Sequence, residues 1–160
     1  MPCNLLPISA IDALSLDYEA SFPLTLVISR SALLRYQIVF RFLLHLKHVE
    51  RVLCSMWLDQ KAAIWRESLP SHPDFDNWRK RLFVLRAKML AFIQQLLSFS
   101  TLDVLEPNWK KFEESLKKVK TVDELIRDHL DFLDTCLKGC MLTNSRLLRV
   151  RVLFDYLLVD

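Results

Sequence analysis

The sequence predicts an all-α fold: a helical bundle of about five helices, two of them long, preceded by a short extended N-terminal segment. The 160 residues include a single glycine, Gly139, which argues against hairpin-rich β folds and Gly-rich phosphate loops. Apolar residues recur every three or four positions over long stretches, as on the buried face of a helix. Prolines fall between these stretches, where they mark connections.

Residues 1–28 are predicted to be coil with an extended stretch, Phe22–Ile28, and residues 29–160 to form the helical domain. Pro23 fixes φ and lacks a backbone donor, and β-branched residues follow it, which favours extended over helical structure. Ser29 or Ser31 then caps a helix that runs to about Lys61, because no Pro or Gly interrupts the pattern. At 1.5 Å per residue this helix is roughly 45 Å long.

Two apolar faces of this long helix predict that it packs from more than one side. The broader one is the core stripe: Ile38, Val39, Phe42, Leu46, Val49, Leu53, Met56 and Trp57. The second is Tyr36, Phe40, Leu43 and Cys54. Between them lies a polar seam, which we call the cation seam: Arg30, Gln37, Arg41, His48 and Arg51. Such a seam is either a solvated charged face or a surface for an acidic partner.

The rest of the chain predicts further helices in order. A second long helix follows Pro73 and continues to about Leu105. Pro107 is tolerated in a first turn, so residues 109–118 form either a separate short helix or a kinked continuation. Thr121 followed by Asp123 and Glu124 predicts a capped helix over 122–137. Gly139 is expected at its C′ position, and Asn144 or Ser145 to open a last helix.

Composition restricts the function classes. A formal charge of +3 without Lys/Arg blocks argues against nucleic-acid binding. The apolar runs near 40–46 and 90–97 are interrupted by charged or amide residues well short of the ~20 that span a bilayer, so we expect no membrane insertion. With no recognisable secretory signal, the cysteines are expected to be reduced.

Catalytic and metal chemistry are weakly indicated. Cys136 and Cys140 with His129 form a conceivable metal site, but buried apolar thiols explain them better. The histidines lack a recognisable nucleophile signature, and the helical carboxylates are typical of a solvated face. Three tryptophans, Trp65, Trp78 and Trp109, lie near basic residues. Nothing in the sequence places them on one base-stacking surface, so core or interface packing explains them better.

Four blocks of sequence carry a family resemblance. Residues 29–43 and 47–57 form the first, Phe83–Gln94 the second, Val104-Leu105-Glu106-Pro107-Asn108-Trp109 the third, and residues 129–144 the fourth. In this order they resemble the C-terminal GRIP-type domain of the γ-tubulin complex proteins, and the last block is similar to the component 2 branch.

The resemblance implies an α-helical, non-catalytic domain that binds γ-tubulin and other complex components, component 3 among them, and supports microtubule nucleation. It implies no cofactor and no metal. It places the protein in the cytoplasm and cytoskeleton, at a centrosome, spindle pole or equivalent organising centre. After Leu148 the sequence departs from the family pattern, and we expect a partial domain. The alternative function is a structural scaffold whose apolar flank pairs with other components instead of tubulin.

Overall fold

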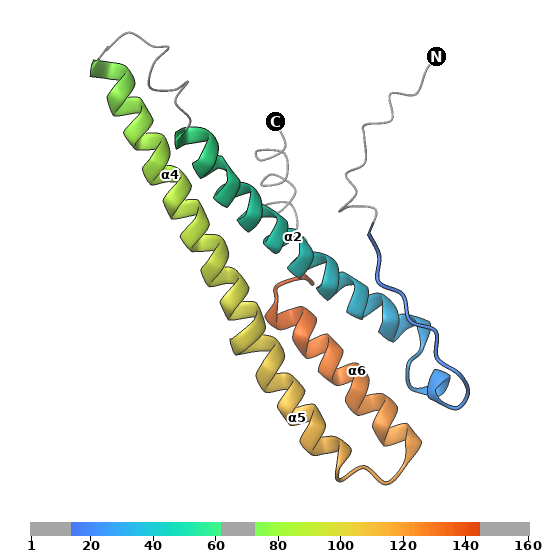
Figure 1. Cartoon of the computed structure of the whole chain (residues 1–160). Coiled ribbons are helices and arrows are strands. Elements are labelled where there is room, and N and C mark those ends of the chain that lie inside the picture. The colour runs from blue at the N-terminus through green and yellow to red at the C-terminus, as the bar shows by residue number, and fades with distance from the viewer. Residues whose placement is uncertain (1–13, 62–72, 145–160) are drawn as a thin grey trace, which may run out of the picture. The chain divides into compact units, whose positions relative to one another are not determined.

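The computed structural model describes residues 14–61 and 73–144, and all regular secondary structure in these ranges is helical (Figure 1). The elements are a short 3₁₀ helix (Leu24–Leu26), α2 (Arg30–Lys61), α4 (Pro73–Ser98), a π segment (Phe99–Leu105), α5 (Glu106–Leu116) and α6 (Val122–Gly139). The all-α prediction is confirmed. The helix expected from Asn144 or Ser145 onward falls on residues outside the described ranges.

The predicted count of about five helices is too high for the part of the chain that is described. Asp76–Leu116 is one helix of 41 residues, so α4, the π segment and α5 are consecutive parts of it, and the described ranges hold three long helices. Pro107 therefore sits in a continuation, as one of the two alternatives had it. The wider π geometry directly precedes Pro107, which has no backbone N–H to donate. Next to it, the side-chain amide of Asn108 donates to the carbonyl of Val104 at 2.7 Å, so this carbonyl has a hydrogen-bond partner.

The extended segment predicted at Phe22–Ile28 is wrong. The backbone N–H of Leu24 donates to the Ser21 carbonyl at 2.9 Å, and those of Val27 and Ile28 donate to the Leu24 carbonyl. This stretch is thus a 3₁₀ turn. The physical reason is that an extended stretch needs a partner strand to satisfy its backbone groups, and no strand occurs among the described residues.

The start and length of α2 agree with the sequence. The Ser29 hydroxyl accepts from the backbone N–H of Ala32 at 3.3 Å, so Ser29 is the N-cap. Five members of the predicted core stripe are buried: Val39, Phe42, Leu46, Val49 and Leu53. The remaining three, Ile38, Met56 and Trp57, are 45%, 38% and 38% exposed, so for them the core prediction is wrong.

The two ends of α6 are built differently from each other. At its start Thr121 is the N-cap, as predicted, and it forms a reciprocal capping box with Glu124. At its end the left-handed residue is Met141, with φ 59°, so the expectation that Gly139 occupies C′ is wrong. The N–H groups of Met141 and Leu142 donate to the Lys138 and Leu137 carbonyls, which is a Schellman motif.

Gly139 is instead explained by close packing. A Cβ on Gly139 would lie 2.5 Å from Cγ1 of Val104 in the π segment. Only a residue without a Cβ allows this approach without displacing Val104.

The chain divides into two compact units. The first contains residues 14–45 and 100–144 of the described chain, and the second contains residues 46–61 and 73–99. In the first unit α6 runs alongside α5 and the beginning of α2 (Figure 1). Its core includes Phe112, Leu133 and Cys136. In the second unit α2 packs against α4: the Arg86 side chain donates to the Leu53 carbonyl at 2.9 Å, and the rings of Trp57 and Phe83 lie 5.8 Å apart.

One described helix, Asp76–Leu116, is long and apolar enough to cross a membrane by length and composition. An 18-residue window of it has a mean hydropathy of 1.4, and 6% of that window is buried. Charged residues still limit the apolar run itself: residues 89–102 contain no Asp, Glu, Lys or Arg, and Lys88 and Asp103 bound them. The same test is passed by a core helix of a bundle, so it does not identify a membrane helix.

Candidate partner-binding surface

The five residues of the cation seam all lie on α2, but they fall in two different units. Arg30, Gln37 and Arg41 belong to the first unit, and His48 and Arg51 to the second. The three arginines are exposed, whereas Gln37 and His48 are partly buried. Helical spacing accounts for the exposure of these arginines, and a surface for an acidic partner requires exposed guanidinium groups.

Gln37 is engaged within the first unit. Its side-chain amide donates to the backbone carbonyl of Leu16 at 2.8 Å, which ties α2 to the segment before it. Gln37 is therefore a positioning residue for that segment more than a free donor for a partner. Sequence periodicity alone does not show such a contact, because Leu16 and Gln37 are far apart in the chain.

His129 is at the centre of the packing in the first unit. It is 4% exposed, and its ring stacks on Phe112 with centroids 5.6 Å apart. Nδ1 lies 3.3 Å from the Val27 carbonyl and Nε2 lies 2.9 Å from the Tyr36 hydroxyl. Burial lowers the pKa of His129, and the nearby charge of Arg35 lowers it further. The histidine considered as a metal ligand thus joins α6, α2 and the 3₁₀ segment.

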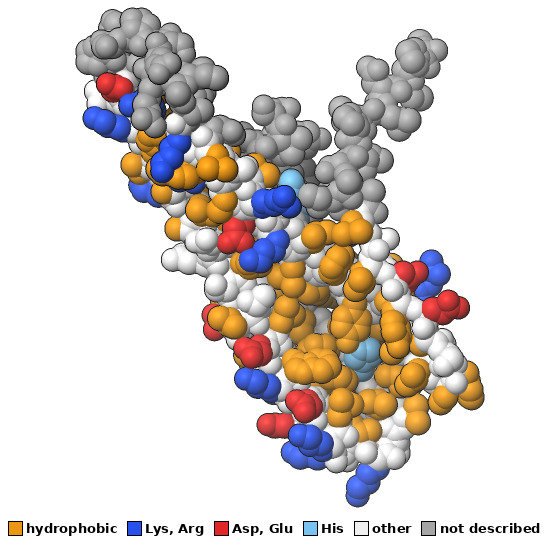
Figure 2. All heavy atoms as spheres, in the orientation of Figure 1, with side chains coloured by type: hydrophobic (Ala, Val, Ile, Leu, Met, Phe, Trp, Pro, Cys, Tyr) orange, Lys and Arg blue, Asp and Glu red, His pale blue; other side chains and the backbone are white. Residues whose placement is uncertain are grey.

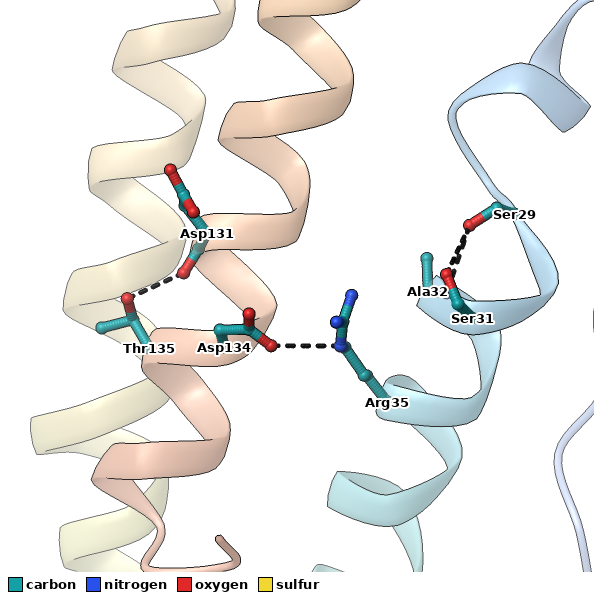
Figure 3. Close-up of polar contacts among 7 residues, drawn as sticks. All are labelled: Ser29, Ser31, Ala32, Arg35, Asp131, Asp134 and Thr135. Atoms are coloured by element: carbon teal, nitrogen blue, oxygen red, sulfur yellow. Dashed lines mark hydrogen bonds and ion pairs between the residues drawn. The ribbon is translucent and has the colours of Figure 1, made fainter.

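An ion pair links α2 and α6 beside this histidine. Nε of Arg35 lies 3.0 Å from the carboxylate of Asp134 (Figure 3). Both side chains are partly exposed, so the pair contributes at most about 1 kcal/mol to stability. Arg35 is not one of the five seam residues, and its charge is paired within the fold.

Cys136 in α6 and Cys140 at its C-cap are buried thiols, as predicted. Burial raises the pKa of Cys136 to about 11, with a smaller contribution from Cys140, so both are poor nucleophiles and poor metal ligands at neutral pH. Among the described residues no group of three or more His, Cys, Asp or Glu side chains is arranged to hold a metal. Cys54, on the second apolar face of α2, is exposed.

Apolar surface is the other feature available to a partner. In the first unit, hydrophobic side chains gather over α6 and the beginning of α2 (Figure 2). Among them, Leu34 and Ile38 lie one helical turn apart on α2 and are about half exposed. In the second unit, α4 has two apolar faces, of which one packs on α2 and the other is largely exposed.

The tryptophans do not assemble into a stacking surface in the part that is described. Trp109 packs edge-on against Phe132 at 5.8 Å and lies next to Phe112 in the first unit, whereas Trp78 belongs to the second unit. Trp65 lies outside the described residues. Trp109 therefore anchors the α5–α6 contact, as core or interface packing predicts.

Comparison with known proteins identifies close relatives. The family model described as Gamma tubulin complex component C-terminal matches residues 2–158. The chain is 43% identical over 145 residues to Spindle pole body component alp4 of Schizosaccharomyces pombe, covering 90% of the chain and 18% of that protein. It is 43% identical over 145 residues to Gamma-tubulin complex component 2 of Mus musculus, covering 91% of the chain and 16% of that protein.

Similarity to component 3 proteins is lower. Gamma-tubulin complex component 3 of Homo sapiens is 30% identical over 151 residues, covering 92% of the chain and 16% of that protein. The chain therefore spans less than a fifth of the length of the relatives it matches.

Proposed function

The chain belongs to the γ-tubulin complex component family, as part of its C-terminal domain, and from this premise we propose that it binds γ-tubulin and supports microtubule nucleation. The support is the match over residues 2–158 together with 43% identity to a component 2 protein and to a spindle pole body component. These names also support a location at a centrosome, spindle pole or equivalent organising centre.

The proposed mechanism is non-catalytic positioning. Buried apolar stripes hold the helices, and the helices present exposed side chains to a partner protein. This mechanism involves binding and no chemical reaction. The Arg30, Arg41 and Arg51 side chains are exposed on α2, and guanidinium groups pair well with carboxylates. The cation seam is thus our candidate for the γ-tubulin contact, with His48 at a partly buried position and Gln37 holding the Leu16 segment against α2.

A pull-down of γ-tubulin with the purified chain tests this function. Arg41→Glu combined with Arg51→Glu should weaken capture at least tenfold, because an attractive charge becomes repulsive against an acidic surface. A matched variant, Lys111→Glu combined with Lys118→Glu, makes the same charge change on exposed residues away from α2 and should leave capture unchanged. Equal capture by both folded variants and the native chain would overturn the seam assignment, and no capture by the native chain would overturn the function.

We also propose other complex components as partners, component 3 among them. The support is the half-exposed pair Leu34 and Ile38 in the first unit, since contiguous exposed apolar surface favours association. Light scattering after size exclusion of the chain mixed with component 3 tests it. A stable complex that Leu34→Glu disrupts is expected, and separate elution of the two proteins would refute the pairing.

A further inference from the structure

The segment that precedes α2 crosses the face of α2 that carries the cation seam. The side-chain amide of Gln37 donates to the Leu16 carbonyl at 2.8 Å, so the segment meets α2 at Gln37. Arg30 lies seven residues before Gln37 and Arg41 four residues after it, which places all three on one face of the helix. Figure 1 shows the segment (blue) running beside the beginning of α2. It therefore reaches the part of the cation seam that belongs to the first unit.

This segment, residues 14–28, is held loosely along most of its length, and we call it the strap. None of these fifteen residues is buried. Six of its large apolar side chains are at least half exposed: Leu14, Leu16, Tyr18, Phe22, Leu24 and Leu26. Segments with little buried apolar surface open at a lower free energy than the core does.

The two ends of the strap are held differently. At its end next to α2, Val27 and Ile28 are partly buried, and the Val27 carbonyl lies 3.3 Å from Nδ1 of the buried His129. At the other end, residues 14–19 are all exposed, and the hydrogen bond from Gln37 joins them to α2. The Leu16 end is therefore the part that detaches most readily, while the Val27 end keeps the strap attached to the first unit.

The strap carries carboxylates where it meets α2. Asp17 directly follows Leu16, Glu19 is two residues further along, and both are exposed. Residues 14–28 include no Lys or Arg, so the strap is acidic. Because Gln37 holds Leu16 on the face that it shares with Arg30, the two carboxylates are kept near a cationic surface. The strap thus offers this surface the same kind of group that an acidic partner would offer.

We propose that the strap is an autoinhibitory segment, which occupies Gln37 and screens the neighbouring arginines of the cation seam until an acidic partner displaces it. This inference rests on the proposed function, since it concerns access to the candidate γ-tubulin contact. Only chains with the strap detached expose the whole first-unit part of the seam. The apparent Kd of a partner is then its intrinsic Kd divided by the detached fraction, so changes that release the strap tighten binding.

Detachment is measured without any partner, in the 160-residue chain. Asp17→Asn combined with Glu19→Gln removes the charge attraction, so the backbone order parameters of residues 14–20 in nuclear magnetic resonance should fall below about 0.6, the range of flexible backbone. Glu106→Gln combined with Glu113→Gln removes the same charge from exposed positions on α5 and should leave these values unchanged. Equal values in both folded variants, or flexible values already in the native chain, would overturn the proposal.

Inhibition is measured with a fluorescent polyglutamate peptide as an acidic probe and with γ-tubulin as the proposed partner. The variant at Asp17 and Glu19 should bind both at least about threefold more tightly than the native chain. The variant at Glu106 and Glu113, which has the same net charge, should bind them no more than half as tightly as the first variant. Equal affinities of the two variants for polyglutamate would overturn the strap proposal. Binding of polyglutamate as expected, without γ-tubulin binding to any of the chains, would overturn the proposed function and leave the inhibition by the strap standing.

Discussion

The hydroxyl of Tyr36 lies 2.9 Å from Nε2 of His129, across the contact between α2 and α6. Because a backbone carbonyl only accepts, Nδ1 of His129 carries the proton donated to Val27. The neutral ring then accepts from the Tyr36 hydroxyl at Nε2. One buried imidazole thus satisfies partners on two other segments of the first unit, which makes it a specific connection within that fold.

Tyr36→Phe should lower the free energy of unfolding by about 1–2 kcal/mol, because the buried acceptor on His129 loses its donor. Urea unfolding monitored by circular dichroism measures this change. Tyr18→Phe is the control: Tyr18 is exposed, so its loss of a hydroxyl should change stability by less than about 0.5 kcal/mol. Similar values for the two variants would show that the Tyr36 hydroxyl contributes no net stability.

The stability of the chain should decrease as the pH falls below the ordinary range for histidine. The pKa of His129 is lowered in the folded protein, so below about pH 6.5 the unfolded chain binds a proton that the folded chain binds less readily. The neutral His129 therefore contributes to the free energy of unfolding above the unfolded-state pKa, and this contribution is lost as the pH falls toward the lower folded-state pKa. Urea unfolding at about pH 7.5 and pH 5.5 should show the loss, and His129→Gln should reduce the difference between the two conditions. An unchanged pH slope in the variant would assign the effect to other groups.

Local signals in the sequence predicted much of this fold. The length of α2 follows from a stretch without Pro or Gly, and residue type gave Ser29 as one of two candidate caps. The capped start of α6 follows from Thr121 and the acids after it. Each depends on neighbours within one helical turn, so periodicity and capping rules suffice.

Tertiary contacts explain the predictions that were wrong. The extended structure expected after Pro23 lacks a partner strand in the described chain, and Gly139 is required by Val104, which is distant in sequence. Exposure of Arg41 and Arg51 on the candidate surface was predictable from helical spacing. The hydrogen bond that engages Gln37 with Leu16 was not, because no short-range pattern connects them.

Met141→Gly should stabilise the chain by about 1 kcal/mol. Met141 has φ 59°, where a side chain costs roughly 1–2 kcal/mol and glycine costs little, and its side chain is about half exposed. Lys138→Gly is the control, because Lys138 is an exposed residue within α6, where glycine should destabilise by about 1 kcal/mol. Thermal and urea unfolding of the two variants should therefore shift in opposite directions. A shift in the same direction for both would show that the left-handed position carries no strain.

Gly139→Ala should destabilise the chain by about 1–3 kcal/mol, against the ordinary helical preference for alanine over glycine. The new Cβ would lie 2.5 Å from Cγ1 of Val104, so α6 or the π segment must shift, and overpacking outweighs a gain in propensity of about 1 kcal/mol. Val104→Ala removes the opposing methyl groups and leaves a cavity when made alone. In the double variant the new methyl group occupies part of that cavity, so its destabilisation should be at least about 1 kcal/mol smaller than the sum of the two single changes. Additive values in urea unfolding would show that Gly139 is not required by the approach of Val104.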